Sequence, residues 1–136
     1  MQSKKKYAQK VAKRKKEDIF ITKKGDQFLS PADRLTYIYI VDTSTNTTIE
    51  VVNVSYEIKV ERVWYTIIRF DSAHGYLHKH SRVSLADEKE TTTRQSVKQK
   101  GEPKHWLTWA IQDIQKNFAE YRRLFFKRSQ VVDSFY

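Results

Sequence analysis

Residues 48–60 have the sequence TIEVVNVSYEIKV, which carries the cleanest two-residue periodicity in the chain. Successive side chains of a β-strand point to opposite faces of the sheet, so the alternation gathers one apolar set on a single face. That set is Val52, Val54, Tyr56, Ile58 and Val60. The intervening residues, Val51, Asn53, Ser55, Glu57 and Lys59, form a wetter face. The segment therefore predicts a strand of an antiparallel sheet with one packed face and one more polar face.

Further strands are expected on both sides of this segment. Residues 35–41 are apolar on both faces and predict a central strand, while residues 63–70 and 78–85 also alternate. Polar residues 42–46 predict a hairpin loop, and Glu61-Arg62 predicts a tight reversal. Residues 19–21 predict a short first strand or a docking segment. We expect a turn after it at residues 23–26 and a second break at residues 30–33.

The C-terminal part of the chain has helical periodicity. Pro103 suits the first turn of a helix, where its missing N–H is not needed. Apolar residues then recur at steps of three and four, which predicts an amphipathic helix of about twenty residues. They are Leu107, Ile111, Ile114, Phe118, Tyr121 and Phe125, with Trp106 and Trp109 broadening the stripe. This stripe should cover the sheet face that carries Tyr56. The polar residues 86–101 predict a loop or an exposed hairpin.

Together these patterns predict an α+β fold. We expect an antiparallel sheet of about four to five strands, a long C-terminal helix on one face, and a basic N-terminal helical arm. Residues 1–18 would be the arm and residues 19–136 a single domain.

The positive charge is concentrated at the N-terminus. The net charge of the 136 residues is +10, and residues 1–16 contribute +8 of it without any acidic residue. The arm is therefore either a solvated tail or a binding element for a phosphate backbone or an acidic partner. Its cations, all candidate nucleic-acid contacts, are Lys4, Lys5, Lys6, Lys10, Lys13, Arg14, Lys15 and Lys16.

Composition narrows the chemistry. The chain has no cysteine, which excludes disulfides, thiolate zinc sites and a cysteine nucleophile. Three glycines are too few for a nucleotide-binding loop, and we expect no cofactor. No apolar run is long enough for a membrane span and no secretory signal is recognisable, so we expect no membrane association and a cytoplasmic location.

The most chemically informative stretch is residues 69–80, RFDSAHGYLHKH, which holds three of the four histidines. Alternation places His78 and His80 on one face, with Lys79 on the other, and lets Arg69 share a face with Asp71. Histidine exchanges protons near neutral pH and a carboxylate can orient it. The catalytic candidates are His74, His78, His80, Asp71 and Arg69, with Lys79 and Arg82 as further RNA contacts.

This grouping suits a metal-independent ribonuclease, because the ribose 2′-hydroxyl supplies the nucleophile and the protein adds only proton transfer and charge stabilisation. Asp71, His74, His78 and His80 could instead ligate zinc, manganese or iron. In a third interpretation His78 and His80 are exposed strand residues and His74 caps a turn. His105, at the start of the predicted helix, could reach the cluster or simply be exposed.

The pattern Arg-x-Asp-x-Ala-His, a short insert, His-x-His and a C-terminal amphipathic helix is similar to that of TumE-type small prokaryotic toxins. The matching residues are Arg69, Asp71, Ala73, His74, His78 and His80. The resemblance covers roughly residues 60–125 and implies a growth-inhibiting protein that acts on RNA and is neutralised by a small antitoxin.

Two functions are therefore expected as alternatives. One is a toxin-like endoribonuclease with RNA as substrate and an antitoxin protein as partner. The other is a non-catalytic module that holds nucleic acid or an acidic protein through the basic arm. The apolar faces of residues 35–41 and 63–70 further predict a homodimer interface or a second covering element, for which residues 19–21 are the candidate.

Overall fold

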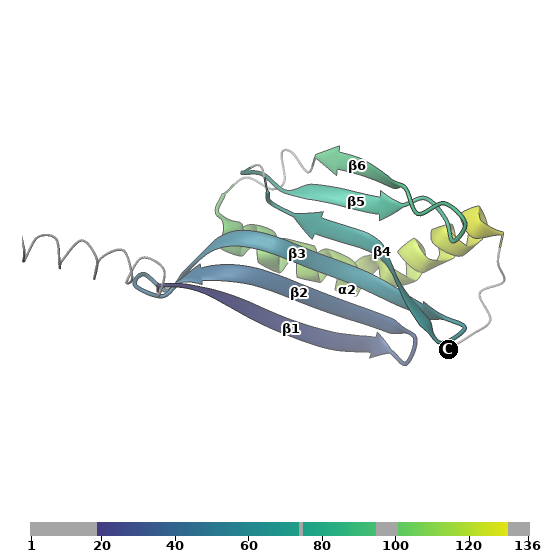
Figure 1. The fold of residues 1–136 in the computed structure, drawn as a ribbon, viewed down its shortest axis with the longest axis horizontal. Helices are drawn as coiled ribbons and strands as arrows, with labels where there is room; N and C mark the ends of the chain where they lie inside the picture. The colour runs from purple at the N-terminus through teal and green to yellow at the C-terminus, as the bar shows by residue number, and fades with distance from the viewer. Residues whose placement is uncertain (1–18, 74, 95–100, 131–136) are drawn as a thin grey trace, which may run out of the picture.

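Six strands follow one another along the chain, and each pairs antiparallel with the next (Figure 1). The computed structural model describes residues 19–73, 75–94 and 101–130. Its elements are β1 (Phe20–Ser30), β2 (Asp33–Asp42), β3 (Thr47–Val60), β4 (Val63–Asp71), β5 (His78–Arg82), β6 (Glu90–Arg94) and α2 (Pro103–Ser129). The predicted α+β class is confirmed. The predicted N-terminal helical arm lies outside the described residues.

The sheet has one strand more than the upper estimate from the sequence. The additional strand is β6, which pairs with β5 in the register His80↔Thr92. Of the two alternatives for residues 86–101, a loop or an exposed hairpin, the hairpin is therefore confirmed as far as Arg94. Its consecutive threonines, Thr91 to Thr93, are β-branched and suit an extended backbone, although they bury no apolar face.

The predicted turn at residues 23–26 is wrong, because β1 runs through it without a break. Gly25 pairs with Tyr37 of β2, and a Cβ atom at position 25 would overlap the Tyr37 ring. The glycine is therefore needed for a close approach of an aromatic ring across the strand pair, not for a reversal. The predicted break at residues 30–33 is the β1–β2 connection.

The predicted alternation of β3 fails at Val52. The register passes from Ile38↔Asn53 to Tyr39↔Val51, so Val52 is an extra residue in a β-bulge. A bulge reverses the facing of the residues on one side of it. As a result Val51 is fully buried, whereas Val52 is only half-buried, the opposite of the predicted assignment.

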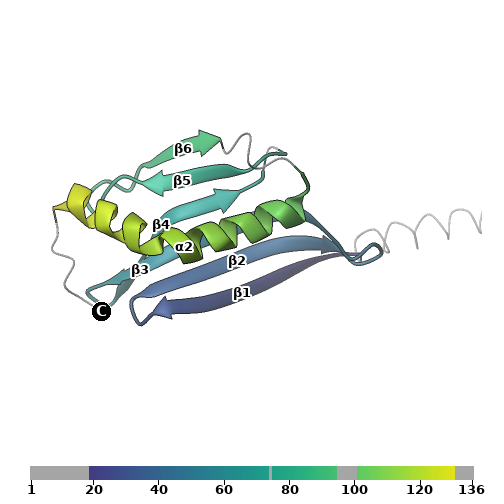
Figure 2. The same ribbon diagram turned by 180° about the vertical axis from the view of Figure 1, so that it is seen from behind.

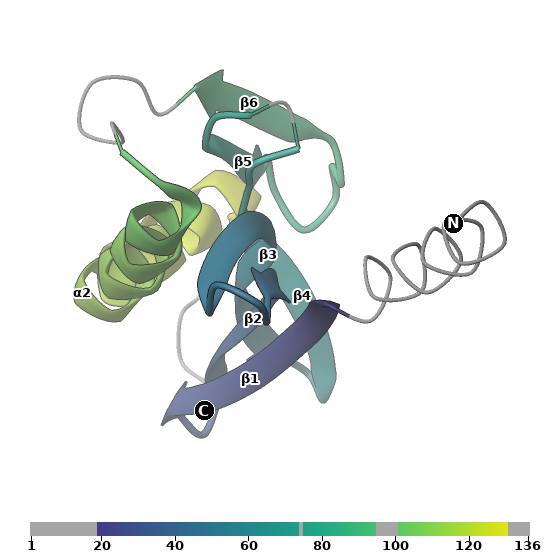
Figure 3. The ribbon, with the colours of Figure 1, turned by 90° about the vertical axis from the view of Figure 1, so that its left-hand side faces the viewer.

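Helix α2 covers one face of the sheet and packs chiefly over β3. It lies behind the sheet in Figure 1, in front of it in Figure 2 and beside it in the end-on view of Figure 3. The predicted apolar stripe of the helix does cover the sheet face that carries Tyr56. The Tyr56 ring packs edge-on against Phe118, with 6.0 Å between the ring centroids. The helix is 27 residues long, and Ala110 and Phe126 are buried in addition to the predicted positions. Nowhere in the described residues is there a helix long and apolar enough to cross a membrane.

A buried ion pair, which the sequence did not indicate, joins the helix to the sheet. Arg122 of α2 donates from Nη1 to Oδ2 of Asp33 at 2.7 Å, and both residues are almost fully buried. The Tyr56 hydroxyl and the Ser30 hydroxyl also donate to the Asp33 carboxylate. Partners of this kind are needed when charges leave water, so the network fixes how α2 lies on the sheet.

Candidate active site on the open face of the sheet

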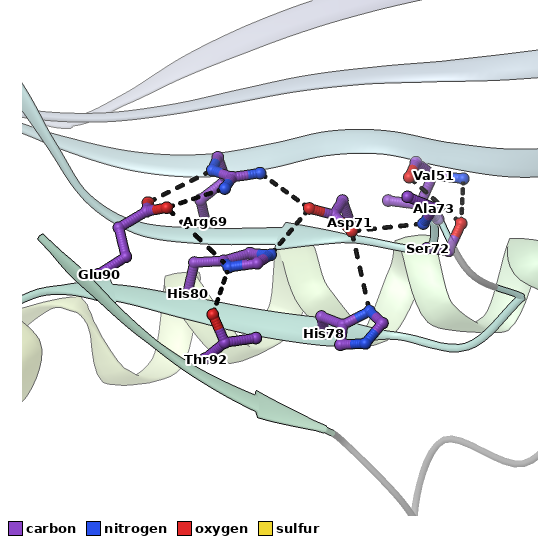
Figure 4. A network of polar contacts seen from close by, with 9 residues as sticks. All are labelled: Val51, Arg69, Asp71, Ser72, Ala73, His78, His80, Glu90 and Thr92. Carbon is purple, nitrogen blue, oxygen red and sulfur yellow. Dashed lines mark hydrogen bonds and ion pairs between the residues drawn. The ribbon is translucent and has the colours of Figure 1, made fainter.

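The register of β4 and β5 brings the predicted catalytic residues together. Arg69 pairs with His80, and Asp71 pairs with His78. Arg69 also pairs with Ser55 of β3, the strand whose alternate residues Tyr56 and Ile58 face the helix. The cluster therefore lies on the face that α2 leaves open, and Figure 4 shows it with the helix behind the sheet.

The Asp71 carboxylate is the centre of the cluster. Its Oδ2 accepts hydrogen bonds from Arg69 Nη1 at 2.8 Å and from His80 Nε2 at 2.9 Å. Its Oδ1 accepts the backbone N–H of Ala73 at 3.3 Å and lies 3.9 Å from Nδ1 of His78. One carboxylate thus positions a guanidinium and an imidazole, which confirms the predicted proximity of Arg69, Asp71, His78 and His80 (Figure 4).

These contacts also set the charge of Asp71. Burial alone would raise the pKa of its carboxyl, but the Ala73 N–H, His80 and Arg69 outweigh burial and hold the pKa below its usual value. The carboxylate is therefore ionised at neutral pH and can only accept hydrogen bonds.

Glu90 of β6 completes the cluster and was not among the predicted residues. It binds the Arg69 guanidinium in a two-point contact, with 2.9 Å from Nη2 to Oε1 and 3.4 Å from Nε to Oε2. Burial alone would lower the pKa of Arg69, but Glu90 and Asp71 raise it. Arg69 is thus held between two carboxylates, so its charge is already neutralised within the protein.

The hydrogen bonds of His80 determine its tautomer. Because ionised Asp71 can only accept, Nε2 of a neutral His80 must carry the proton, which leaves Nδ1 as the acceptor. In this neutral form the Thr92 hydroxyl, 3.0 Å from Nδ1, is the donor, and Oε1 of Glu90 lies 4.0 Å from the same nitrogen. Residues 91–93 are exposed, so the hydrogen bond between the Thr92 hydroxyl and Nδ1 of His80 lies at the protein surface.

His78 lies beside His80 on the same face of β5. Its ring is roughly parallel to that of His80, with 6.2 Å between the centroids, and it contacts the Tyr76 ring at 4.2 Å. The residue is only 9% exposed, so Tyr76 and the neighbouring strands cover most of it. The two imidazoles are therefore close neighbours, and both side chains are largely enclosed, with 11% of His78 and 15% of His80 exposed.

The structure does not bring every predicted site residue to this cluster. Lys79 points to the opposite face, where its Nζ donates to the Tyr121 hydroxyl of α2 at 2.9 Å. A period of two would place Arg82 on the face of His80, but its guanidinium lies over the Tyr65 ring, beside the core, so it is not an RNA contact of the cluster. His105 is exposed and accepts the backbone N–H of Glu102 through Nδ1 at 3.4 Å. His74 and the cations of residues 1–16 lie outside the described residues.

The match to a protein family covers most of the chain. Residues 15–131 match a domain of unknown function, DUF7718. The chain belongs to the DUF7718 family. No curated protein and no solved structure matches it at a significant level.

In this DUF7718 protein the described side chains offer no ready metal site. Among them, no group of three or more histidine, aspartate and glutamate residues has an arrangement that could hold a metal ion. Asp71 and His80 are instead engaged with each other, with Arg69 and with Thr92, which is the arrangement of an oriented acid/base pair.

An aromatic and basic patch lies on the same open face of the DUF7718 fold. Trp64 of β4 pairs with Lys59, and its ring carries the Arg34 guanidinium at 4.2 Å and the Lys59 ammonium at 5.9 Å. The Phe28 ring lies 6.0 Å from Trp64, and Phe28 is 62% exposed. Glu57, bonded to Arg34 and two residues from Ser55, connects this patch to the face of the cluster.

Proposed function

We propose that this protein is a metal-independent endoribonuclease that cleaves single-stranded RNA at the cluster of Asp71, His78 and His80. The observation that carries the proposal is the bond from His80 Nε2 to the ionised Asp71 carboxylate, which directs the basic Nδ1 of His80 away from Asp71 toward the surface. The resemblance to TumE-type toxins supports a cytoplasmic, growth-inhibiting role with a protein antitoxin as partner.

His80 is the general base of the proposed reaction. A ribose 2′-hydroxyl would replace the Thr92 hydroxyl on Nδ1, because both groups donate the same kind of hydrogen bond. Nδ1 takes the 2′-hydroxyl proton while the 2′-oxygen attacks the adjacent phosphorus. The negative charge of Asp71 stabilises the imidazolium that forms, as an orienting carboxylate does in other acid/base pairs.

His78, in its protonated form, is the general acid. Its ring lies 6.2 Å from that of His80, so the two imidazoles can flank one phosphodiester. His78 gives its proton to the departing 5′-oxygen, and the products are a 2′,3′-cyclic phosphate and a 5′-hydroxyl. Arg69 holds Asp71 in place and does not contact the phosphate, because both Asp71 and Glu90 already bind it.

The patch around Trp64 supports single-stranded RNA as the substrate class. Unpaired bases stack on aromatic rings, and the exposed Phe28 and half-buried Trp64 offer such rings on the face of the cluster. Lys59 beside Trp64 adds positive charge near the bound RNA, whereas the charge of Arg34 is paired with that of Glu57. The basic residues 1–16 would add affinity that falls as salt rises.

The proposal is tested by incubating the purified protein with a mixed single-stranded RNA pool, with and without a chelator. We expect cleavage that is indifferent to the chelator and falls at least about 100-fold in a His78→Ala/His80→Ala variant, the usual effect of losing acid/base groups. His105→Ala, an exposed histidine outside the cluster, is the matched control and should retain full activity. Cleavage that survives in the double variant, or a folded wild type that cleaves nothing, would refute the ribonuclease.

A non-catalytic nucleic-acid-binding module is the second candidate. The observation that favours it is that Arg69 and both ring nitrogens of His80 are already bonded within the protein. This candidate predicts that Trp64→Ala or removal of residues 1–16 abolishes RNA binding, while a folded His78→Ala/His80→Ala variant binds RNA as the wild type does.

A further inference from the structure

A pocket of about 310 Å3 lies on the other side of the sheet, between the C-terminal half of α2 and strands β4, β5 and β6. Ile67 and Leu124 contribute apolar walls, and Lys79, Arg82 and Arg128 contribute cationic groups. The Tyr121 hydroxyl lies beside the Lys79 ammonium. No carboxylate side chain is among the described residues that line the pocket, so its charge has a single sign.

The two arginines of the pocket are bonded differently from most others. Arg34, Arg69, Arg122 and Arg123 each pair with a carboxylate. Arg82 instead donates to the backbone carbonyls of Ser84 and Leu85, at 2.9 and 2.8 Å, and Arg128 donates to that of Val83 at 2.9 Å. These carbonyls orient the guanidinium groups but leave their charge uncompensated.

Lys79 is half-buried in the pocket. Its Nζ lies 4.3 Å from the centre of the Tyr121 ring and within hydrogen-bond distance of the Tyr121 hydroxyl, which in turn donates to Asp113. Burial lowers the pKa of Lys79, and the charge of Asp113 only partly opposes this. An ammonium group that has lost part of its hydration gains more from a bound anion than an exposed one does.

We propose that this pocket binds a small amphipathic organic anion, whose phosphate or carboxylate group contacts Lys79, Arg82 and Arg128 and whose apolar body packs against Ile67 and Leu124. The volume lies at the lower end of the range for small-molecule sites, which favours a ligand the size of one or two rings. The site is separate from the cluster around Asp71, because Lys79 and His80 project from opposite faces of β5.

The binding test compares four probes by isothermal titration calorimetry of the full chain. They are 1-naphthyl phosphate, 1-naphthoate, neutral 1-naphthol and inorganic phosphate. We expect one or both naphthyl anions to bind at least about 10-fold more tightly than naphthol, because a charge-assisted hydrogen bond is worth that much. Whichever anion binds more tightly identifies the head group. Equal affinity for naphthol, or no binding of either anion, would overturn the proposal.

Variants locate the binding in the pocket. Lys79→Met and Arg128→Met should each weaken the better anion about 10-fold or more, while Arg123→Met, on the exposed face of the same helix, should leave binding unchanged. Leu124→Trp keeps all three cations but fills the pocket, and it should also abolish binding. If Lys79→Met, Arg128→Met and Leu124→Trp fold and still bind the anion with wild-type affinity, the proposed site is wrong.

The pocket and the ribonuclease are tested independently. His78→Ala/His80→Ala should bind the naphthyl anion as the wild type does. The result of the anion-binding experiment therefore does not depend on the result of the RNA cleavage experiment.

Discussion

At the scale of single residues, Asp71 determines what the cluster can do. Its Oδ2 accepts hydrogen bonds from Arg69 and His80. Because its carboxylate is ionised, the proton of a neutral His80 must be on Nε2. The basic Nδ1 of His80 therefore faces the Thr92 hydroxyl, with Oε1 of Glu90 at 4.0 Å. The proposed chemistry depends on this orientation more than on the number of histidines.

Thr92→Val tests whether the Thr92 hydroxyl holds the place of the substrate. The change keeps the shape of the side chain but removes its hydrogen bond to His80. If a ribose hydroxyl must displace it, RNA cleavage at low substrate should rise by about two- to tenfold, the worth of one such bond. Steady-state kinetics against wild type measure this. A large fall in kcat would instead mean that Thr92 takes part in the reaction or positions His80.

The pH dependence of stability tests the charge of Asp71. Its pKa in the folded protein lies below the unfolded value of about 3.9, so its ionised form stabilises the fold above that pH. This contribution disappears as the pH falls through the lower, folded value. Wild type should therefore lose more stability than Asp71→Asn between pH 7 and pH 3 in urea unfolding experiments.

The matched control for that experiment is Asp26→Asn, an exposed carboxylate on the same face of the sheet. Its urea midpoint should follow that of wild type across the pH range. A constant difference between wild type and Asp71→Asn at every pH would contradict an ionised, stabilising Asp71.

The residues of β4 and β5 in the cluster could be predicted from the sequence, because a period of two fixes which side chains share a face. Glu90 and Thr92 could not, since their position depends on the pairing of β6 with β5 across a polar connection that contains no hairpin dipeptide. The run of β-branched threonines was the one available signal. Arg82 shows a second limit of the sequence argument. Alternation assigns it to the face of His80, but its long side chain reaches the Tyr65 ring on the other face.

At the scale of elements, β1 and β3 show how tertiary contacts override local signals. Lys23 to Asp26 has the composition of a turn, yet the ring of Tyr37 requires the space above Gly25 in a continuous strand. Val52 interrupts an otherwise regular alternation through a bulge that only the partner strand specifies. The adjacent turn at Glu61 and Arg62 was predictable, and both residues have the positive φ angles, 49° and 71°, of a tight hairpin turn.

A double-mutant cycle tests the role of Gly25. Gly25→Ala should destabilise the protein by about 1–3 kcal/mol, because its methyl group overlaps the Tyr37 ring. In a Tyr37→Ala background the same change should cost little or become stabilising, since alanine suits a strand better than glycine. Urea unfolding of the four proteins gives the coupling energy. A Gly25→Ala cost that is independent of Tyr37 would contradict the close approach.

At the scale of the whole molecule, the described helix and sheet produce two faces of different character. The face under α2 holds the core and the cationic pocket. The open face holds the aromatic patch and the cluster around Asp71, which Figure 4 shows with the helix behind the sheet. This layer arrangement was predictable from the helical stripe and the alternation of β3. The way in which α2 is fixed was not, because Arg122 and Asp33 are 89 residues apart and neither has an apolar signature.

The buried pair makes a prediction about global stability. Arg122→Met should destabilise the protein by about 3–5 kcal/mol, because it leaves the buried Asp33 carboxylate without its cation. Arg123→Met, the exposed neighbour, should stay within about 0.5 kcal/mol of wild type. Thermal or urea unfolding measures both. Equal effects of the two changes would show that the Asp33 network does not fix the helix on the sheet.

The chemical ends of the RNA fragments distinguish cleavage by the 2′-hydroxyl from other kinds of RNA hydrolysis. Attack by the 2′-hydroxyl, with His80 as base and His78 as acid, must leave a 2′,3′-cyclic phosphate on one fragment and a 5′-hydroxyl on the other. Mass spectrometry of a defined oligoribonucleotide after incubation with the protein identifies both ends. Those two ends, absent with His78→Ala/His80→Ala, are the predicted result. Fragments with 3′-hydroxyl and 5′-phosphate ends, or an intact oligonucleotide, would contradict it.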